Sequence, residues 1–229
     1  MVDPMLGVVG SVRAMAGVPR RNPTVELPCP VGEVLDGVDG VLVSHLHPDH
    51  FDDAALGLLP RHHTVLGAPS TRARLEEVGF EHIVELSETV RWRGLTITPT
   101  DGRHGNGDIV ARMGEVIGVV LTADGEPTVY WAGDTILYPP VLDLIDRVRP
   151  DVIVTHSGGA AVGDVKIIMD AADTVQVARA APWATVIAVH FEAIAHCFAT
   201  RAELRAATDD AGLPATRLLI PADGETISI

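Results

Sequence analysis

The sequence predicts an α/β protein in which helices cover the faces of a β-sheet. Short runs of β-branched and apolar residues recur along the chain, and helical patterns separate several of them. The composition agrees, because 47% apolar residues with 22 Gly and 16 Pro indicate many short elements joined by turns. The 229 residues contain no repeat, low-complexity tract or obvious linker, so we expect one domain over residues 1–229.

The predicted strands are short and rich in Val, Ile, Leu and Thr, as strands with buried faces are. In chain order they are VLVS (41–44), TVLG (64–67), LTITPT (95–100), VIGVVLT (116–122), TVYWAG (128–133), VIVT (152–155), TVIAV (185–189) and RLLIP (217–221).

The predicted helices carry recognisable start and stop signals. They are PSTRARLEEVGF (69–80) with Ser70 as N-cap and Gly79 as stop, PPVLDLIDRVRP (139–150) bracketed by prolines, MDAADTVQVARAAP (169–182) capped by Asp170, and TRAELRAATDDAG (200–212) with a Thr200–Glu203 capping box and Gly212 as stop.

Charge and cysteine content exclude several classes of function. The net charge is -14 and Lys166 is the only lysine, which disfavours nucleic-acid partners because phosphate binding requires clustered basic side chains. Cys29 and Cys197 form no C-x-x-C pair, so neither a disulfide framework nor a thiolate metal site is predicted. The first residues, MVDPMLG, do not resemble a signal peptide, and no apolar run approaches the roughly 18 residues of a membrane span. We therefore expect a cytoplasmic protein without a membrane span.

A dense group of metal-ligand residues, HLHPDH, follows the first predicted strand. In extended backbone His45 and His47 project to the same side. Pro48 turns the chain, so that Asp49 and His50 can point into the same space. Imidazole and carboxylate without thiolate suit zinc, iron or manganese. A single segment seldom supplies four ligands to one metal ion that keeps a coordination position open. Four candidate ligands within six residues therefore favour two neighbouring ions.

Further candidate ligands stand where other predicted strands end. His104, Asp134 and His190 each follow such a strand, and strand ends at one rim of a sheet can converge on one cleft. His156 obeys the same rule and competes with His190 as a ligand. We expect His156 and His196 to contact either substrate or a metal-ligating residue rather than the metal itself.

The motifs S-H-L-H-P-D-H (44–50), R-H-G (103–105), W-A-G-D-T (131–135) and A-V-H-F (188–191) together resemble the metallo-β-lactamase superfamily. The resemblance covers residues from about 40 to 190 and implies a four-layer αββα sandwich with the site at one edge of two sheets. By the resemblance, one ion would be held by His45, His47 and His104, the other by Asp49, His50 and His190, and Asp134 would bridge them. The chain is further similar to the branch of ascorbate-6-phosphate lactonases and N-acyl phosphatidylethanolamine phospholipase D enzymes.

The implied activity is metal-dependent hydrolysis of a small ester-like substrate, a lactone or a phosphodiester. Two divalent ions, zinc first and manganese or iron as alternatives, would activate a hydroxide, and Asp49 would orient it or take a proton as the catalytic residue. One alternative is a di-iron redox protein on the same fold, but that pattern has glutamate where His47 stands. Another is a non-catalytic metal-binding or sensor protein.

The start of the chain departs from the family pattern. Members usually open with a β-hairpin that leads to an aspartate matched by Asp3, and by the resemblance we expect this hairpin to be lacking here. We therefore expect residues 1–20 to be partly irregular, and one sheet edge to be short, covered or paired in a homo-oligomer. Asp3 receives no role. Asp52 and Asp53 fit either a helix N-terminus or contacts to a ligating histidine, and Gly158 and Gly159, with Lys166 or Arg103, fit either an anion contact or a plain turn.

Overall fold

The computed structural model describes residues 1–14 and 17–229. The chain divides into two compact units. Unit 1 contains residues 1–88 and 193–195, and unit 2 contains residues 89–192 and 196–229. Two compact units can still unfold as one cooperative domain, so the expected single domain over residues 1–229 stays a prediction.

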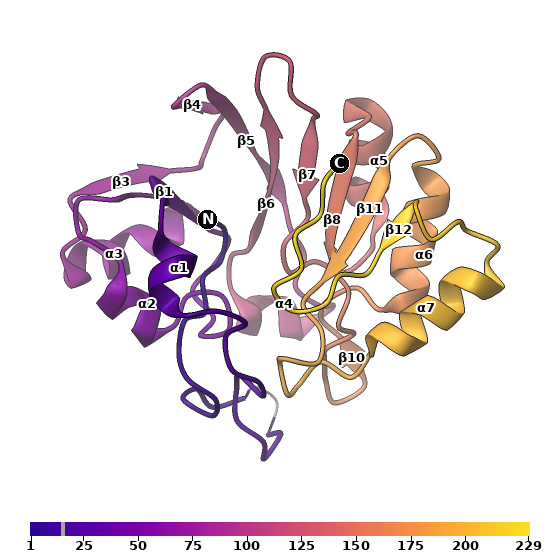
Figure 1. The fold of residues 1–229 in the computed structure, drawn as a ribbon, viewed down its shortest axis with the longest axis horizontal. Helices are drawn as coiled ribbons and strands as arrows, with labels where there is room; N and C mark the ends of the chain where they lie inside the picture. The colour runs from indigo at the N-terminus through magenta and orange to yellow at the C-terminus, as the bar shows by residue number, and fades with distance from the viewer. Residues whose placement is uncertain (15–16) are drawn as a thin grey trace. The chain divides into compact units, whose positions relative to one another are not determined.

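Unit 1 is built on a three-stranded parallel sheet in the order β1-β2-β3. Helical segments connect the strands, as parallel pairing requires, and Figure 1 shows α2 and α3 along one side of this sheet. Its core holds Val41, Val65, Leu75 and Phe80. The elements are α1 (Val31–Leu35), β1 (Gly40–Val43), α2 (Asp53–Leu58), β2 (Thr64–Gly67), the 3-10 helix η1 (Pro69–Thr71), α3 (Arg72–Val78) and β3 (His82–Glu85).

The first three residues cover the free edge of β1. The Met1 amino group donates to the Gly40 carbonyl at 3.1 Å, the Leu42 amide donates to the Met1 carbonyl at 2.9 Å, and the Asp3 amide donates to the Leu42 carbonyl at 2.9 Å. Within the described part of residues 1–20 there is no hairpin, and the only strand-like pairings are isolated bridges at Val2 and Val12. The expected irregular start and covered edge are therefore confirmed.

Asp52 fastens the N-terminal segment to the start of α2. Its carboxylate is 2% exposed and caps α2 by accepting the Ala55 amide on Oδ1 at 2.8 Å. It also accepts the amides of Leu6 at 3.1 Å and Gly7 at 2.7 Å. Of the two roles expected for Asp52, the structure shows the helix N-cap.

Unit 2 is built on a seven-stranded sheet in the order β12-β11-β8-β7-β6-β5-β4. Neighbours from β4 to β7 are antiparallel, and those from β7 through β8 and β11 to β12 are parallel. Figure 1 shows α6 and α7 beside β11 and β12. The elements are β4 (Val90–Trp92), β5 (Leu95–Asp101), α4 (Asp108–Met113), β6 (Ile117–Thr122), β7 (Val129–Trp131), α5 (Pro139–Val148), β8 (Val152–His156), β9 (Ala161–Val162), β10 (Val165–Lys166), α6 (Ala171–Ala180), β11 (Thr185–Val189), α7 (Arg201–Asp210) and β12 (Leu218–Leu219).

Most of the helix signals are confirmed. Asp170 caps α6, Thr200 and Glu203 form a capping box on α7, and Gly79 ends α3 with φ 94°. Ser70 as an N-cap is wrong, because Pro69 begins a 3-10 turn that contains it and α3 starts only at Arg72.

Lys166 pairs with the first turn of α6. Its ammonium group donates to Asp170 at 2.7 Å and to Asp173 at 2.6 Å. Burial alone would raise the pKa of Asp170, but the hydrogen bonds from Lys166 and from the Asp173 amide outweigh it and lower that pKa. The positive charge of Lys166 is therefore already compensated within the fold, which counts against Lys166 in the anion contact, one of the two roles that the sequence left open.

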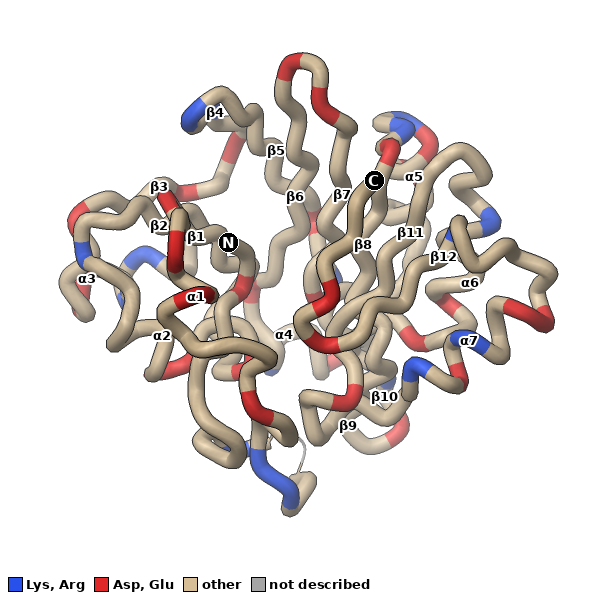
Figure 2. The backbone as a smooth tube through the Cα atoms, in the orientation of Figure 1, with Lys and Arg blue, Asp and Glu red and all other residues tan. Residues whose placement is uncertain are grey.

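Charged side chains are spread over both units, and Figure 2 shows acidic residues on helices of both units. None of the helices in the described part of the chain is long and apolar enough to cross a membrane.

Replacing Asp52 with alanine should destabilise the protein strongly. Three amides would lose a buried, charged acceptor, so we expect the free energy of unfolding to fall by about 3 kcal/mol. Asp53→Ala is the matched control, because Asp53 is exposed in the same helix turn and its loss should change stability by no more than about 0.5 kcal/mol. Urea unfolding of both variants tests this, and equal losses would contradict the role of Asp52.

Candidate functional site

The HLHPDH segment forms a histidine cluster directly after β1, in which His45 and His50 are buried and His47 is half-buried. Nε2 of His45 lies 2.8 Å from Nδ1 of His47, and the rings of His45 and His50 are 4.1 Å apart between centroids. The amides of His50 and Phe51 donate to the His47 carbonyl, which makes the turn after Pro48 that returns the chain to the cluster. The expected convergence of His45, His47 and His50 is therefore seen in unit 1.

Asp3 and Ser44 set the orientation of two of these imidazoles. The Ser44 hydroxyl donates to Oδ2 of Asp3 at 2.7 Å, so its oxygen is left to accept from Nδ1 of His45 at 2.9 Å. Oδ2 of Asp3 also accepts from Nδ1 of His50 at 3.0 Å. With both Nδ1 atoms protonated, neutral His45 and His50 carry their lone pair on Nε2, which is the state that binds a metal ion. Asp3, which was given no role from the sequence, is thus a positioning residue.

In unit 2, polar side chains gather where strands of the large sheet end. Strands β7, β8 and β11 are neighbours and parallel, so their carboxyl ends lie at one edge, and β5 runs in the same direction because two antiparallel pairings separate it from β7. Asp134 follows β7, His156 ends β8, His190 follows β11 and His104 follows β5. The strand-end rule is confirmed for these residues.

Asp134 is the centre of this second cluster and is only 4% exposed. Nδ1 of His156 donates to its Oδ1 at 2.7 Å, while Nε2 of His104 lies 3.5 Å from Oδ2 and Nε2 of His190 lies 3.9 Å from Oδ1. The rings of His156 and His190 stack with centroids 4.9 Å apart. One buried carboxylate is thus enclosed by imidazoles from strand ends at the same edge of the sheet.

Two loops of unit 2 are tied together so that His104 and Asp134 stay adjacent. The Arg103 amide donates to the Thr135 hydroxyl at 3.0 Å, and the Ile136 amide donates to the Arg103 carbonyl at 2.9 Å. Nδ1 of His104 donates to the Ile167 carbonyl at 2.7 Å, which leaves its Nε2 as the lone-pair nitrogen on the side of Asp134.

The backbone around His190 is unusual. His190 has φ 65°, a left-handed conformation that L residues seldom adopt. Its Nδ1 lies 3.3 Å from Sγ of Cys197. A Cβ on Gly158 would come within 2.2 Å of the His190 carbonyl oxygen and 2.5 Å of the Cys197 sulfur, so only glycine allows this close approach. Gly158 therefore acts in packing.

The residues present fit a divalent metal ion. Buried imidazoles and a carboxylate are the donors that zinc, iron and manganese share, and the hydrogen bonds to Nδ1 leave Nε2 of His45, His50 and His104 as neutral donors. Within unit 2, Asp134, His156 and His190 can place one ligand atom each within 4.8 Å of one another. A buried carboxylate among imidazoles is also the kind of group that a cation would stabilise.

Two residues near the clusters, Asp3 and Cys197, were missed by sequence reasoning. Neither Asp3 nor Cys197 was given a role from the sequence. The sequence features that could have drawn attention to them were the Asp-Pro pair at the chain start and the position of Cys197 beside His196. His156 was expected to contact either substrate or a metal-ligating residue, and its Nδ1 donates to Asp134, the proposed bridging ligand. Asp49 and His196 are both buried, and their proposed roles remain predictions.

Comparison with known proteins places these clusters in a family context. Residues 1–191 match the β-lactamase superfamily domain. A protein of Bacillus subtilis (strain 168), UPF0173 protein YddR, is 35% identical over 232 residues, which cover 99% of this chain and 91% of YddR.

Two solved structures are similar over the whole chain. The isothiocyanate hydrolase from Delia radicum gut bacteria is 35% identical with a TM-score of 0.92, and the match covers 100% of this chain and 91% of that protein. A protein from Veillonella parvula DSM 2008, described as a possible metal-dependent hydrolase, is 29% identical with a TM-score of 0.95 and the same coverage.

Replacing Gly158 with alanine should destabilise unit 2, because the new methyl group would meet a backbone oxygen that cannot move aside freely. We expect the free energy of unfolding to fall by about 2 kcal/mol. Gly57→Ala is the matched control, since Gly57 lies in α2 with no atom within 4 Å of its Cβ position, and there alanine should stabilise by roughly 0.5 kcal/mol. Chemical denaturation of both variants tests the contact. If Gly158→Ala is as stable as the parent, Gly158 and the His190 carbonyl oxygen are not packed as closely as the contact requires.

Proposed function

Because this chain belongs to the metallo-β-lactamase superfamily of metal-dependent hydrolases, we propose that it hydrolyses a small electrophilic substrate with divalent metal ions as cofactors. The expected metallo-β-lactamase fold is confirmed by the same similarities. The observation that carries the proposal is the buried Asp134 carboxylate enclosed by the imidazoles of His104, His156 and His190. A cluster of imidazoles and a carboxylate can hold the divalent ions that activate water in metal-assisted hydrolysis.

We propose two ions, with zinc as the first choice and manganese or iron as alternatives. The ligand set is that of the resemblance: His45, His47, Asp49, His50, His104, Asp134 and His190. When bound, such ions supply Lewis acidity and activate water at neutral pH. Asp3 contacts His50 directly and His45 through Ser44. These contacts hold both imidazoles in the tautomer with a lone pair on Nε2, which metal binding requires.

His156 receives one of the two roles expected from the sequence, contact with a metal-ligating residue. Its Nδ1 donates to Oδ1 of Asp134 at 2.7 Å, so the proton on Nδ1 fixes that carboxylate and leaves Oδ2 toward His104. Stacking on His190 holds the ring of His156 in place. We infer that His156 is a positioning residue for Asp134. Asp49 is proposed as the carboxylate that orients the attacking water or takes its proton, and His196 as a substrate contact.

The proposed substrate is small and ester-like, a lactone or a phosphodiester, because an acidic protein suits a small metabolite better than a polyanionic polymer. An isothiocyanate is a second candidate, favoured by the 35% identity to an isothiocyanate hydrolase over the full chain. Both classes present an electrophilic centre to water. Hydrolysis of phenyl isothiocyanate consumes one water and releases aniline and carbonyl sulfide.

Two non-hydrolytic alternatives remain testable. A di-iron redox protein would have glutamate at the position of His47, whose Nδ1 lies 2.8 Å from His45. A metal-binding sensor would keep the metal without turnover. The first experiment below separates the sensor from the hydrolase.

Zinc-loaded and manganese-loaded protein should hydrolyse at least one member of a panel of δ-valerolactone, bis(p-nitrophenyl) phosphate and phenyl isothiocyanate. Chelation should abolish turnover, and added metal should restore it. Substituting a residue that only orients a metal ligand typically lowers activity by roughly 10- to 100-fold. Because His190 is proposed as a ligand itself, His190→Ala should lower kcat by more than that. His62→Ala and His82→Ala, both exposed, should leave kcat unchanged. A metal-loaded protein that turns over none of the panel would favour the sensor.

Elemental analysis should find more than one equivalent of metal per chain. Asp134→Ala and His190→Asn should lower the content at saturation, because each removes a proposed ligand. His156→Asn should keep that content but weaken metal affinity by about 10- to 100-fold, the effect expected when a ligand loses its orienting partner.

The exposed His82→Asn serves as control in the metal titration. A parent content at or below one equivalent would remove the dinuclear proposal. If His156→Asn loses metal while His190→Asn retains it and stays active, His156 is the ligand and His190 is not.

A further inference from the structure

Cys197 lies beside His190, one of the proposed metal ligands. Its Sγ atom is 3.3 Å from Nδ1 of His190, which is within hydrogen-bond reach because sulfur is a large atom. Both residues belong to unit 2, and Cys197 is half-buried. The other ring nitrogen of His190, Nε2, lies on the side of Asp134. The thiol therefore contacts the back of a ring whose front nitrogen faces the buried carboxylate.

Gly158 makes room for this contact. A Cβ at Gly158 would lie 2.5 Å from the Cys197 sulfur and 2.2 Å from the His190 carbonyl oxygen, so a side chain there would displace both residues of the pair. The Ala199 amide donates to the Gly158 carbonyl at 2.9 Å, which holds the chain two residues after Cys197. The sulfur is thus kept in place by backbone packing at the end of β8.

His190 is held in place as firmly as the sulfur. The Ser157 amide donates to the Val189 carbonyl at 2.9 Å, which extends the pairing of β8 and β11 to the residue before His190. His190 then takes a left-handed φ of 65°, which persists only where the surrounding structure enforces it. Its ring stacks on that of His156, with the planes 21° apart. The short distance between sulfur and imidazole therefore joins two constrained groups.

The position of the sulfur favours one tautomer of His190. A proton on Nδ1 meets the Cys197 sulfur, which is a weak acceptor. A proton on Nε2 would not form a hydrogen bond with Asp134, because the 3.9 Å between Nε2 and Oδ1 exceeds the roughly 3.2 Å limit of such a bond. With the proton on Nδ1, the lone pair is on Nε2, and the neutral ring can bind a metal ion there.

We propose that Cys197 is a positioning residue for His190. Its sulfur accepts a hydrogen bond from Nδ1, which fixes the ring and leaves Nε2 as the nitrogen that binds a metal ion on the side of Asp134. This role deepens the proposed function and rests on it, since it requires His190 to be a ligand. Metal affinity then depends on a thiol that lies behind the ligand.

Nitrogen-15 NMR of metal-free protein with labelled histidine shows which ring nitrogen of His190 carries the proton. The buffer is slightly alkaline, so that the imidazoles are neutral, and His190→Asn identifies the resonances. We expect the Nδ1-protonated form in the parent and in Cys197→Ser, whose hydroxyl oxygen also accepts. Cys197→Ala removes the acceptor, so the ratio of the two tautomers should shift toward the Nε2-protonated form by at least about threefold.

Zinc titration against a competing chelator gives the second readout. Cys197→Ala should keep the metal content at saturation but weaken affinity for the ion that His190 is proposed to bind by about 10- to 100-fold. Cys197→Ser should stay within about threefold of the parent, because it keeps an acceptor at the same position.

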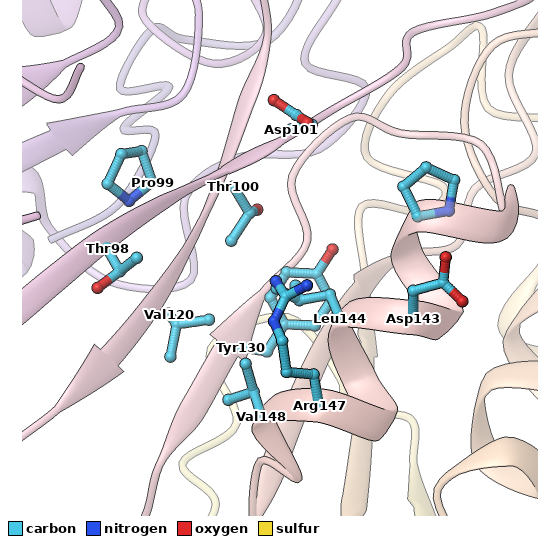
Figure 3. Close-up of a pocket in the computed structure, with 11 residues that line it drawn as sticks. Thr98, Pro99, Thr100, Asp101, Val120, Tyr130, Asp143, Leu144, Arg147 and Val148 are labelled. Carbon is cyan, nitrogen blue, oxygen red and sulfur yellow. The ribbon is translucent and has the colours of Figure 1, made fainter. Parts of the chain in front are cut away.

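Two control variants separate a positioning role from a loss of packing. Cys29→Ala removes the same thiol from the other half-buried cysteine, which lies in unit 1. Val148→Ala removes packed atoms in unit 2, at a cavity of about 450 Å³ that is shown in Figure 3 and has no residue of either histidine cluster in its lining. Val148→Ala should lower the melting temperature. Both controls should leave the His190 tautomer and the zinc affinity unchanged.

Several results would overturn the role of Cys197. They are a proton on Nε2 of His190 in the metal-free parent, and a tautomer or zinc affinity that does not change in Cys197→Ala. Loss of one zinc equivalent at saturation in both Cys197→Ala and Cys197→Ser also overturns it, because the cysteine would then be a ligand itself. A parent that binds no zinc overturns the proposed function, while the tautomer measurement still decides separately whether Cys197 sets the protonated nitrogen of His190.

Discussion

The structure of unit 2 depends on a buried carboxylate whose negative charge must be compensated. Asp134 is 4% exposed, and its oxygens face nitrogen atoms of His104, His156 and His190. An ionised group at that depth is tolerated only with close partners. The hydrogen bond from Nδ1 of His156 compensates it in part, and a divalent cation would compensate it further, which would link the stability of this edge of the sheet to metal binding.

The surrounding backbone is arranged to satisfy that constraint. The contacts from Thr135 and Ile136 to Arg103 keep the loop after β7 beside the loop after β5. On the other side, Gly158 admits the His190 carbonyl at a distance that no Cβ would allow, and His190 itself takes a left-handed φ. Strain of this kind persists only where the neighbouring structure enforces it, and it commonly marks functional sites.

Residues 1–3 of unit 1 have two structural roles. Residues 1–3 cover the open edge of β1 by backbone pairing, and the side chain of Asp3 then reaches Ser44 and His50. Asp52 ties the following residues to α2. Edge protection and orientation of the histidine cluster are therefore coupled, because a shift of the first residues would move the carboxylate that holds both imidazoles.

Local signals in the sequence determined much of this protein. The β-branched runs, the caps at Asp170 and Thr200, and the H-x-H-x-D-H segment after a strand depend on neighbouring residues, so they can be read directly. The failure at Ser70 is also local, since a proline beside it favours a 3-10 turn over an immediate α-helix.

Tertiary structure alone decided which strand ends are neighbours and which side chains meet there. The sequence placed His156 and His190 at equivalent strand ends, but only the parallel pairing of β8 with β7 and β11 sets His156 against Asp134. The same holds for Asp3, which lies 47 positions from His50 in the chain. Strand order and the contacts of a chain terminus depend on burial of the whole sheet and on pairing between distant segments, and no local pattern encodes them.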